Sequence, residues 1–299
     1  MEIHESKSAR RQPRVWETYR SLWWLLLCVC AFAATANAQA SGSAAAYFNR
    51  AQSLYRNGNL DGAKKDLDIA IAFDSRYVAA LVSRGIIRYL QHDLDGAIAD
   101  FDRAIEINPA LSEAYNNRGN ARKGKGNLSG AVADYSQAIA HRRGYADAYY
   151  NRANIELESG DLAAAIVDYS EAIKINPQLI EAYNNRANAF YGQGDLVRAI
   201  SDYTQAIKLN PRLPYPYNGR GNARLATGDL DAALADYTRA IEADAGFADA
   251  YANRGLAYLL QGKTSEARGD FARCLKLDAR LKTSLEERIR RLKPLKRPQ

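Results

Sequence analysis

The sequence predicts an all-α fold of the α-solenoid class, a stack of similar helix pairs. Between Ala44 and Leu281 one 34-residue pattern occurs seven times, in phase and with no residue inserted or deleted. A strict period of this length indicates one supersecondary unit that is copied and stacked, each copy covering the apolar face of its neighbour. Bulky and small residues recur inside each copy at helical spacing, which predicts two amphipathic helices per copy.

The seven copies follow one another without a linker, and we number the positions of each copy as places 1 to 34. Their predicted bounds are 44–77, 78–111, 112–145, 146–179, 180–213, 214–247 and 248–281. Place 20 is Ala in every copy, which lets the two helix backbones approach closely. Most copies have Gly followed by Asp or Asn between the helices, as in Gly160-Asp161-Leu162. The Gly is expected to end the first helix and the Asp to cap the second.

The residues before the array have the pattern of an export signal. Four arginines between positions 10 and 20 precede an apolar run at 22–34, and Ala36-Asn37-Ala38 offers a cleavage site. We therefore expect residues 1–38 to be a cleavable bacterial signal peptide and 39–43 a short N-terminal arm. The mature protein would then be periplasmic or secreted. The alternative is an uncleaved membrane anchor, although the apolar run is short for a membrane span.

The charge distribution argues against nucleic acid as a partner. The net charge of +7 comes from the two ends, 1–38 and 282–299, whereas 39–281 has equal numbers of basic and acidic residues. A nucleic-acid surface on a solenoid needs a basic stripe along the array. The array is neutral, so we expect no nucleic-acid binding.

The repeated motifs resemble those of the tetratricopeptide repeat (TPR) family, in its exported bacterial form. The resemblance rests on segments such as Ala114-Tyr115-Asn116-Asn117-Arg118-Gly119 and Ala165-Ile166-Val167-Asp168-Tyr169, and on closing prolines such as Pro109 and Pro177. It implies a right-handed superhelix of seven helix-turn-helix repeats, with a concave groove lined by the first helices. It also implies a function in binding proteins or peptides.

The residues after the seventh copy predict a capping helix at 282–293 and a disordered basic tail at 294–299. Leu281, Leu285, Ile289 and Leu292 share one helical face, which would cover the last helix pair as solenoid ends require. The alternative is a basic amphipathic surface for lipid or an acidic partner. Cys274 is the one cysteine beyond the predicted signal and stands where other copies have Ala, so we expect a core residue rather than a reactive thiol.

Place 7 is Arg and place 23 is Asp in all seven copies. The TPR family more often has an apolar residue at place 7, so the guanidinium is expected to be partly buried and to need a carboxylate. We predict a structural ladder of bidentate ion pairs, within or between repeats, with anion binding as the alternative. Its central members are Arg118, Arg152, Arg186, Asp134, Asp168 and Asp202.

Asparagine recurs at places 6 and 9, which line the groove in the TPR family. A carboxamide both donates and accepts, so a column of them could pair with the backbone of an extended peptide whatever its side chains. The pattern resembles the asparagine ladder of O-linked N-acetylglucosamine transferases; the alternative is a solvated face without function. The predicted peptide-binding residues are Asn49, Asn117, Asn120, Asn151, Asn154, Asn185, Asn188, Asn222 and Asn253.

The first two copies have an apolar face in place of the asparagines. Exposed apolar patches of this kind often mark an interface, unless another part of the chain covers them. The predicted patch consists of Phe48, Val82, Ile86, Tyr89 and Leu90.

Catalytic chemistry is not expected. The three histidines, His4, His92 and His141, are far apart in the sequence, and it has no metal-ligand cluster, nucleophile elbow or phosphate loop. We therefore expect no enzyme activity, no cofactor and no metal. The leading hypothesis is an adaptor that binds an extended segment of a partner protein in its groove. The alternative is a scaffold that self-assembles into a homo-oligomer through the apolar face of repeats 1 and 2.

Overall fold

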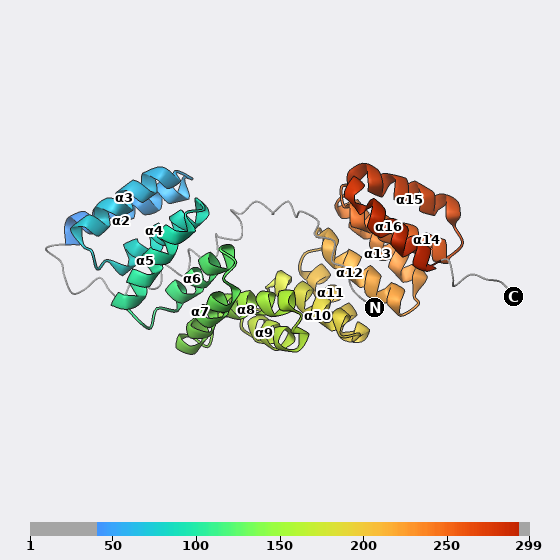
Figure 1. Cartoon of the computed structure of the whole chain (residues 1–299), viewed down its shortest axis with the longest axis horizontal. Coiled ribbons are helices and arrows are strands. Elements are labelled where there is room, and N and C mark those ends of the chain that lie inside the picture. Colours follow the sequence, from blue (N-terminus) through green and yellow to red (C-terminus); the bar gives the residue numbers. More distant parts are fainter. Residues whose placement is uncertain (1–40, 293–299) are drawn as a thin grey trace. The chain divides into compact units, whose positions relative to one another are not determined.

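The computed structural model describes residues 41–292, and this part of the chain is all-helical. It contains fifteen α-helices, one short 3-10 helix and no strand, as the α-solenoid prediction requires (Figure 1). The predicted signal peptide and the basic tail lie outside the described residues. Residues 41–43, expected in the N-terminal arm, already belong to the first helix. None of the described helices combines the length and the apolar character that crossing a bilayer requires.

Fourteen of the helices form consecutive pairs, each pair joined by a short turn. The first helices are α2 (Ser41–Arg56), α4 (Val78–Leu90), α6 (Ser112–Gly124), α8 (Ala146–Ser159), α10 (Ile180–Gly192), α12 (Pro214–Ala226) and α14 (Ala248–Leu260). The second helices are α3 (Leu60–Phe73), α5 (Leu94–Ile107), α7 (Leu128–His141), α9 (Leu162–Ile175), α11 (Leu196–Leu209), α13 (Leu230–Ala243) and α15 (Thr264–Leu277). All second helices begin at place 17, and all first helices after α2 begin at place 1.

The turn between the two helices uses the residues that the sequence indicated. In the third repeat Gly126 has a φ of +80°, and the Asn127 side chain then accepts a hydrogen bond from the Gly130 N–H at 2.9 Å. This bond satisfies one of the free N–H groups at the start of α7. Glycine at place 15 is needed because a side chain there would strain the left-handed backbone. The exception is His92, which adopts a φ of +62°.

Replacing His92 with Gly is expected to stabilise the protein by about 0.5–1 kcal/mol. The left-handed conformation costs a residue with a side chain about 1–2 kcal/mol, and part of this gain is offset because glycine loses more backbone entropy on folding. Urea unfolding of His92→Gly measures the gain. Gly126→Ala is the matched control: it has open space around the added methyl group, so it should lose about 1 kcal/mol through the backbone alone. Equal midpoints for both variants would contradict this account.

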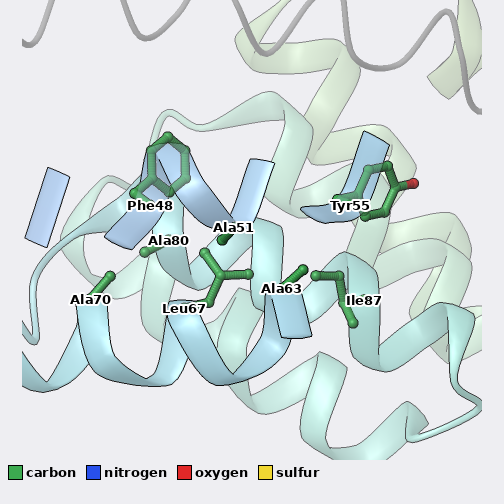
Figure 2. Packing of buried hydrophobic residues seen from close by; sticks show 8 residues of the cluster. All are labelled: Phe48, Ala51, Tyr55, Ala63, Leu67, Ala70, Ala80 and Ile87. Carbon is green, nitrogen blue, oxygen red and sulfur yellow. The ribbon is translucent and has the colours of Figure 1, made fainter. Parts of the chain in front are cut away.

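The described residues divide into two compact units, 41–152 and 153–292, with the division inside α8. In both units the small residues lie where the helices touch: the Ala at place 20 is fully buried in every repeat. Figure 2 shows the start of the first unit, where Leu67 of α3 is directed toward Ala51 of α2, between Ala63 and Ala70. This core is thin, and each pair of helices completes it with side chains from the next pair.

The second unit ends in a single helix, α16 (Lys282–Leu292), which follows the 3-10 turn η1 (Ala279–Leu281). Leu285 of α16 is 4% exposed and packs with Tyr251, Leu256 and Cys274. Cys274 is fully buried, as expected of a core residue, and burial raises the pKa of its thiol to about 11. Helix α16 therefore covers the apolar side that α14 and α15 would otherwise leave open.

Candidate functional site

The recurrent arginines and aspartates pair within one repeat. In the third repeat Arg118 donates from Nε to Asp134 Oδ2 at 3.0 Å and from Nη2 to Oδ1 at 2.6 Å. The same bidentate geometry, or a close variant of it, joins Arg50 to Asp66, Arg84 to Asp100, Arg186 to Asp202, Arg220 to Asp236 and Arg254 to Asp270. The seven aspartates at place 23, Asp168 among them, are at most 7% exposed.

From the second repeat on, the remaining guanidinium nitrogen of the place 7 arginine reaches the preceding repeat. Arg118 Nη1 donates to Asp102 Oδ1 at 2.6 Å, and Arg152 Nη1 donates to Ser136 Oγ at 2.9 Å. The guanidinium groups also lie over the Tyr rings at place 4, as Arg118 does over Tyr115 at 5.3 Å from the ring centroid. Arg118 thus ties three helices together, α5, α6 and α7, and its donors are used inside the protein. This arrangement supports a structural role rather than anion binding.

A second set of arginines strengthens the ladder and was missed in the sequence. Arg122 Nη1 donates to Asp134 Oδ2 at 2.8 Å, so that one buried carboxylate holds two guanidinium groups. Arg88 and Arg224 make the same contact with Asp100 and Asp236. The available signal was the recurrence of Arg at place 11 in the second, third and sixth repeats.

The asparagines at place 9 are held by buried tyrosines from place 24 of the same repeat. The Tyr hydroxyl donates to the Asn Oδ1 in four repeats: Tyr135 to Asn120 at 2.8 Å, Tyr169 to Asn154 at 2.7 Å, Tyr203 to Asn188 at 2.5 Å and Tyr237 to Asn222 at 2.9 Å. These tyrosines are at most 2% exposed, and burial raises the pKa of Tyr203 and of Tyr237, which keeps the hydroxyls protonated.

This pairing was also missed, although the sequence contains its signal. Asn at place 9 occurs together with Tyr at place 24 in repeats 3 to 6. Repeats 2 and 7 instead combine Ile86 with Phe101 and Leu256 with Phe271. An apolar residue at place 9 thus accompanies a ring without a hydroxyl, because a buried Tyr O–H needs an acceptor.

The asparagines at place 6 mostly connect neighbouring first helices. In the first unit Asn151 Nδ2 donates to Asn116 Oδ1 at 3.0 Å, and in the second unit Asn185 Nδ2 donates to Asn154 Oδ1 at 3.0 Å. Asn117 is half-buried and Asn49 is exposed near the start of the first unit. The predicted groove residues are therefore partly engaged with one another before any partner is bound.

Asn253 does not offer the accessible surface that was expected of it. It is 4% exposed, its Nδ2 donates to Asn218 Oδ1 at 2.8 Å, and its Oδ1 accepts from Arg288 Nη2 at 2.5 Å. The reason is that α16 packs against α14 and brings Arg288 onto this carboxamide. The prediction is wrong for this residue because it considered the first helix without the helix that follows the array.

The apolar patch predicted on repeats 1 and 2 is also smaller than expected. Phe48 and Val82 are each 3% exposed, while Ile86, Tyr89 and Leu90 remain partly exposed. Phe48 packs against α4, and its ring lies 5.1 Å from that of Tyr77. Both buried residues stand at place 5, which faces the next first helix rather than solvent. The prediction of a five-residue exposed patch is therefore wrong.

Acidic residues at place 2 have local cations beside them. Arg142 Nη1 donates to Glu113 Oε1 at 2.9 Å. Burial raises the pKa of Asp147 while Arg142 opposes this effect, and burial raises the pKa of Asp249 while Arg288 opposes it. Burial in turn lowers the pKa of Arg288. Within residues 41–292 no three His, Cys, Asp or Glu side chains come together as a metal site.

Comparison with known families identifies the repeats. Models of the tetratricopeptide repeat match residues 48–112, 180–213 and 248–280, and a model described as TPR repeat matches 153–194 and 221–262. This chain carries tetratricopeptide repeats. The TPR motif accounts for the helix pairs and for the small residue at place 20. No curated protein matches the sequence.

Solved TPR structures share the fold. A tetratricopeptide repeat protein from Parabacteroides merdae is 20% identical over 83% of this chain and 98% of its own, with a TM-score of 0.60. The C-terminal part of a TPR repeat-containing protein from Cytophaga hutchinsonii is 20% identical over 78% and 95%, with a TM-score of 0.63. YrrB, described as a TPR protein with an unusual peptide-binding site, is 22% identical over 60% and 92%, with a TM-score of 0.53.

Proposed function

We propose that this protein is an interaction scaffold whose first helices bind an extended segment of a partner protein. The observation that carries the proposal is the asparagine row, which we define as Asn154, Asn188 and Asn222 in residues 153–292. These carboxamides stand at the same place of three successive repeats, are not fully buried, and are each held by a tyrosine hydroxyl. Side chains held in one orientation bind with a smaller loss of conformational entropy.

An extended peptide fits this row better than a compact ligand does. Neighbouring helices pack about 8–10 Å apart, a distance that about three residues cover in the extended polyproline II conformation, at about 3.1 Å each and with the third residue returning to the same side. A peptide lying across the first helices therefore meets each carboxamide at a regular interval. Backbone groups recur at such intervals in every sequence, whereas the side chains differ. YrrB supports the proposal as a TPR protein described with a peptide-binding site.

Self-assembly through repeats 1 and 2 is less well supported. Phe48 and Val82 are buried inside the first unit, so the accessible apolar residues are Ile86, Tyr89 and Leu90. Three partly exposed side chains offer little area for a stable interface, which requires about 800 Å² on each partner. We therefore propose peptide binding as the function.

The proposal is tested by selecting peptides from a random display library, with the full chain as the immobilised bait. The peptides are linear and have about a dozen residues, long enough to pass three first helices. A row-swap variant copies the Leu256 and Phe271 pair of repeat 7 into the three repeats of the row. It combines Asn154→Leu, Asn188→Leu and Asn222→Leu with Tyr169→Phe, Tyr203→Phe and Tyr237→Phe. We expect it to bind the selected peptides at least about tenfold more weakly, since each hydrogen bond contributes about 0.5–1.5 kcal/mol.

The control replaces Val167 and Val197 of the second helices with Ala. These side chains are 62% and 78% exposed, and their replacement should change neither folding nor peptide affinity. Thermal unfolding followed by circular dichroism confirms that the row-swap variant is folded. A folded row-swap variant with wild-type affinity would refute the proposed function, and so would a library that yields no binding peptide.

A further inference from the structure

We infer that Tyr169, Tyr203 and Tyr237 are positioning residues that turn the asparagine row into a row of hydrogen-bond donors, which recognises the backbone carbonyl groups of the bound segment and not its N–H groups. This inference rests on the proposed function and specifies which chemical group of the partner is bound. It begins from the hydroxyl contacts: in all three repeats the tyrosine oxygen lies 2.5–2.9 Å from the Asn Oδ1.

A chain of hydrogen bonds sets the orientation of the first carboxamide. Asn184 Nδ2 donates to Asn185 Oδ1 at 3.2 Å, and Asn185 Nδ2 donates to Asn154 Oδ1 at 3.0 Å. The Tyr169 hydroxyl donates to the same Asn154 oxygen at 2.7 Å. The Asn154 Oδ1 thus accepts two hydrogen bonds, one for each lone pair of an amide oxygen, and points inward toward Tyr169. Its Nδ2 then points away from Tyr169.

In the remaining two asparagines of the row, the oxygen and the nitrogen of the carboxamide differ in the partners they already have. The Oδ1 atoms of Asn188 and Asn222 each accept a hydrogen bond from a buried hydroxyl, that of Tyr203 or Tyr237, and are thereby turned toward the core. The Nδ2 groups of both residues donate to no protein group among residues 41–292, and the two side chains are partly or fully exposed. Unused N–H donors at a surface pair with an acceptor of the ligand. In a peptide the acceptor that recurs in every sequence is the backbone carbonyl.

The tyrosines are not required by the core. Repeats 2 and 7 pack Phe101 and Phe271 at the same place, with Ile86 and Leu256 above them. Phe101 is fully buried and Leu256 is 4% exposed, so the apolar pair also fills this space. The chain therefore contains two solutions to the same packing problem. The polar solution is used in the repeats that form the row, where it adds oriented donors.

A double-mutant cycle on a selected peptide tests the positioning role. Tyr203→Phe is expected to weaken binding about 3–10-fold, because Asn188 is then free to rotate and its oxygen needs a partner. The same change made together with Asn188→Leu should have no further effect on binding. Tyr145→Phe is the matched control, since the Tyr145 hydroxyl bonds to Asn116 and both residues lie in residues 41–152, apart from the asparagine row. It should leave the affinity unchanged.

Replacing single backbone amides of the peptide with thioamides tests the polarity. A thiocarbonyl is a weaker acceptor than a carbonyl, whereas its N–H is a stronger donor, so the two models predict opposite signs. We expect weaker binding at positions about three residues apart, the spacing of neighbouring first helices. Stronger binding at those positions, or an equal effect of Tyr203→Phe with and without Asn188, would overturn the inference while leaving peptide binding established. Selected peptides that are insensitive to the row swap would instead refute the proposed function itself.

Discussion

Replacing Asp134 with Ala is expected to lower the free energy of unfolding by about 3–5 kcal/mol, the cost of leaving buried charges without their partner. Asp134 is 2% exposed and accepts from both Arg118 and Arg122, whose side chains are 14% and 27% exposed. Arg118 would stay in place, held by Asp102 and by the ring of Tyr115, and both guanidinium groups would lose the carboxylate that compensates them. Guanidinium chloride unfolding measures the loss.

Asp66→Ala is the control for this effect. Asp66 is also buried, but its partner Arg50 is 61% exposed and water can solvate the released charge. Exposed ion pairs contribute about 0–1 kcal/mol, so the loss should be several-fold smaller than for Asp134. If the two variants lose the same free energy, burial of the arginines is not the cause. A two-step unfolding curve for Asp134→Ala would show that the break separates neighbouring repeats, as nearest-neighbour coupling in solenoids predicts.

Replacing Leu285 with Ala is expected to lower the free energy of unfolding by about 2–4 kcal/mol, as for other buried leucines that leave a cavity. Leu285 is the buried residue by which α16 packs on Tyr251, Leu256 and Cys274. Loosening α16 also removes Arg288 from Asn253, so the amide protons of α14 should exchange faster with deuterium. Exchange measured by mass spectrometry locates this effect.

Thr283→Ala is the matched control, because Thr283 lies in the same helix and is exposed. Its effect should stay within about 0.5 kcal/mol of zero, as for most surface substitutions. If Leu285→Ala destabilises no more than Thr283→Ala, α16 is not a cap. Faster exchange throughout residues 153–292, rather than in α14, would show that the unit unfolds as a whole.

The places of the helices could be predicted because their signals are local. Gly at place 15 and Asp or Asn at place 16 act on the backbone of the same turn, and both are present in five of the seven repeats. The recurrence of Arg at place 7 and Asp at place 23 likewise predicted a ladder. It left open which arginine meets which aspartate, because the contact of Arg118 with Asp134 depends on how the two helices of one repeat pack.

The candidate site shows more clearly what could not be predicted from the sequence. Asparagine recurrence indicated the row, but each carboxamide has two ends, and sequence cannot tell which end is engaged. The hydroxyls of Tyr169, Tyr203 and Tyr237 bond to the oxygen end of each carboxamide. These tyrosines lie 15 residues further along the chain, in the second helix of the same repeat. Phe48, Val82 and Asn253 were assigned to an accessible surface, yet the next first helix, or α16, covers them.

The sequence by itself therefore determined the class of fold, the helix pairs and the residues that recur, because a strict 34-residue period repeats the same local signals. Only the tertiary structure decided which polar atoms remain available. An atom is buried, paired or free according to its neighbours in space, and those neighbours come from the adjacent helix or the adjacent repeat. Asn253 links two first helices through Asn218, whereas Asn222 is held by the hydroxyl of Tyr237 and remains partly exposed.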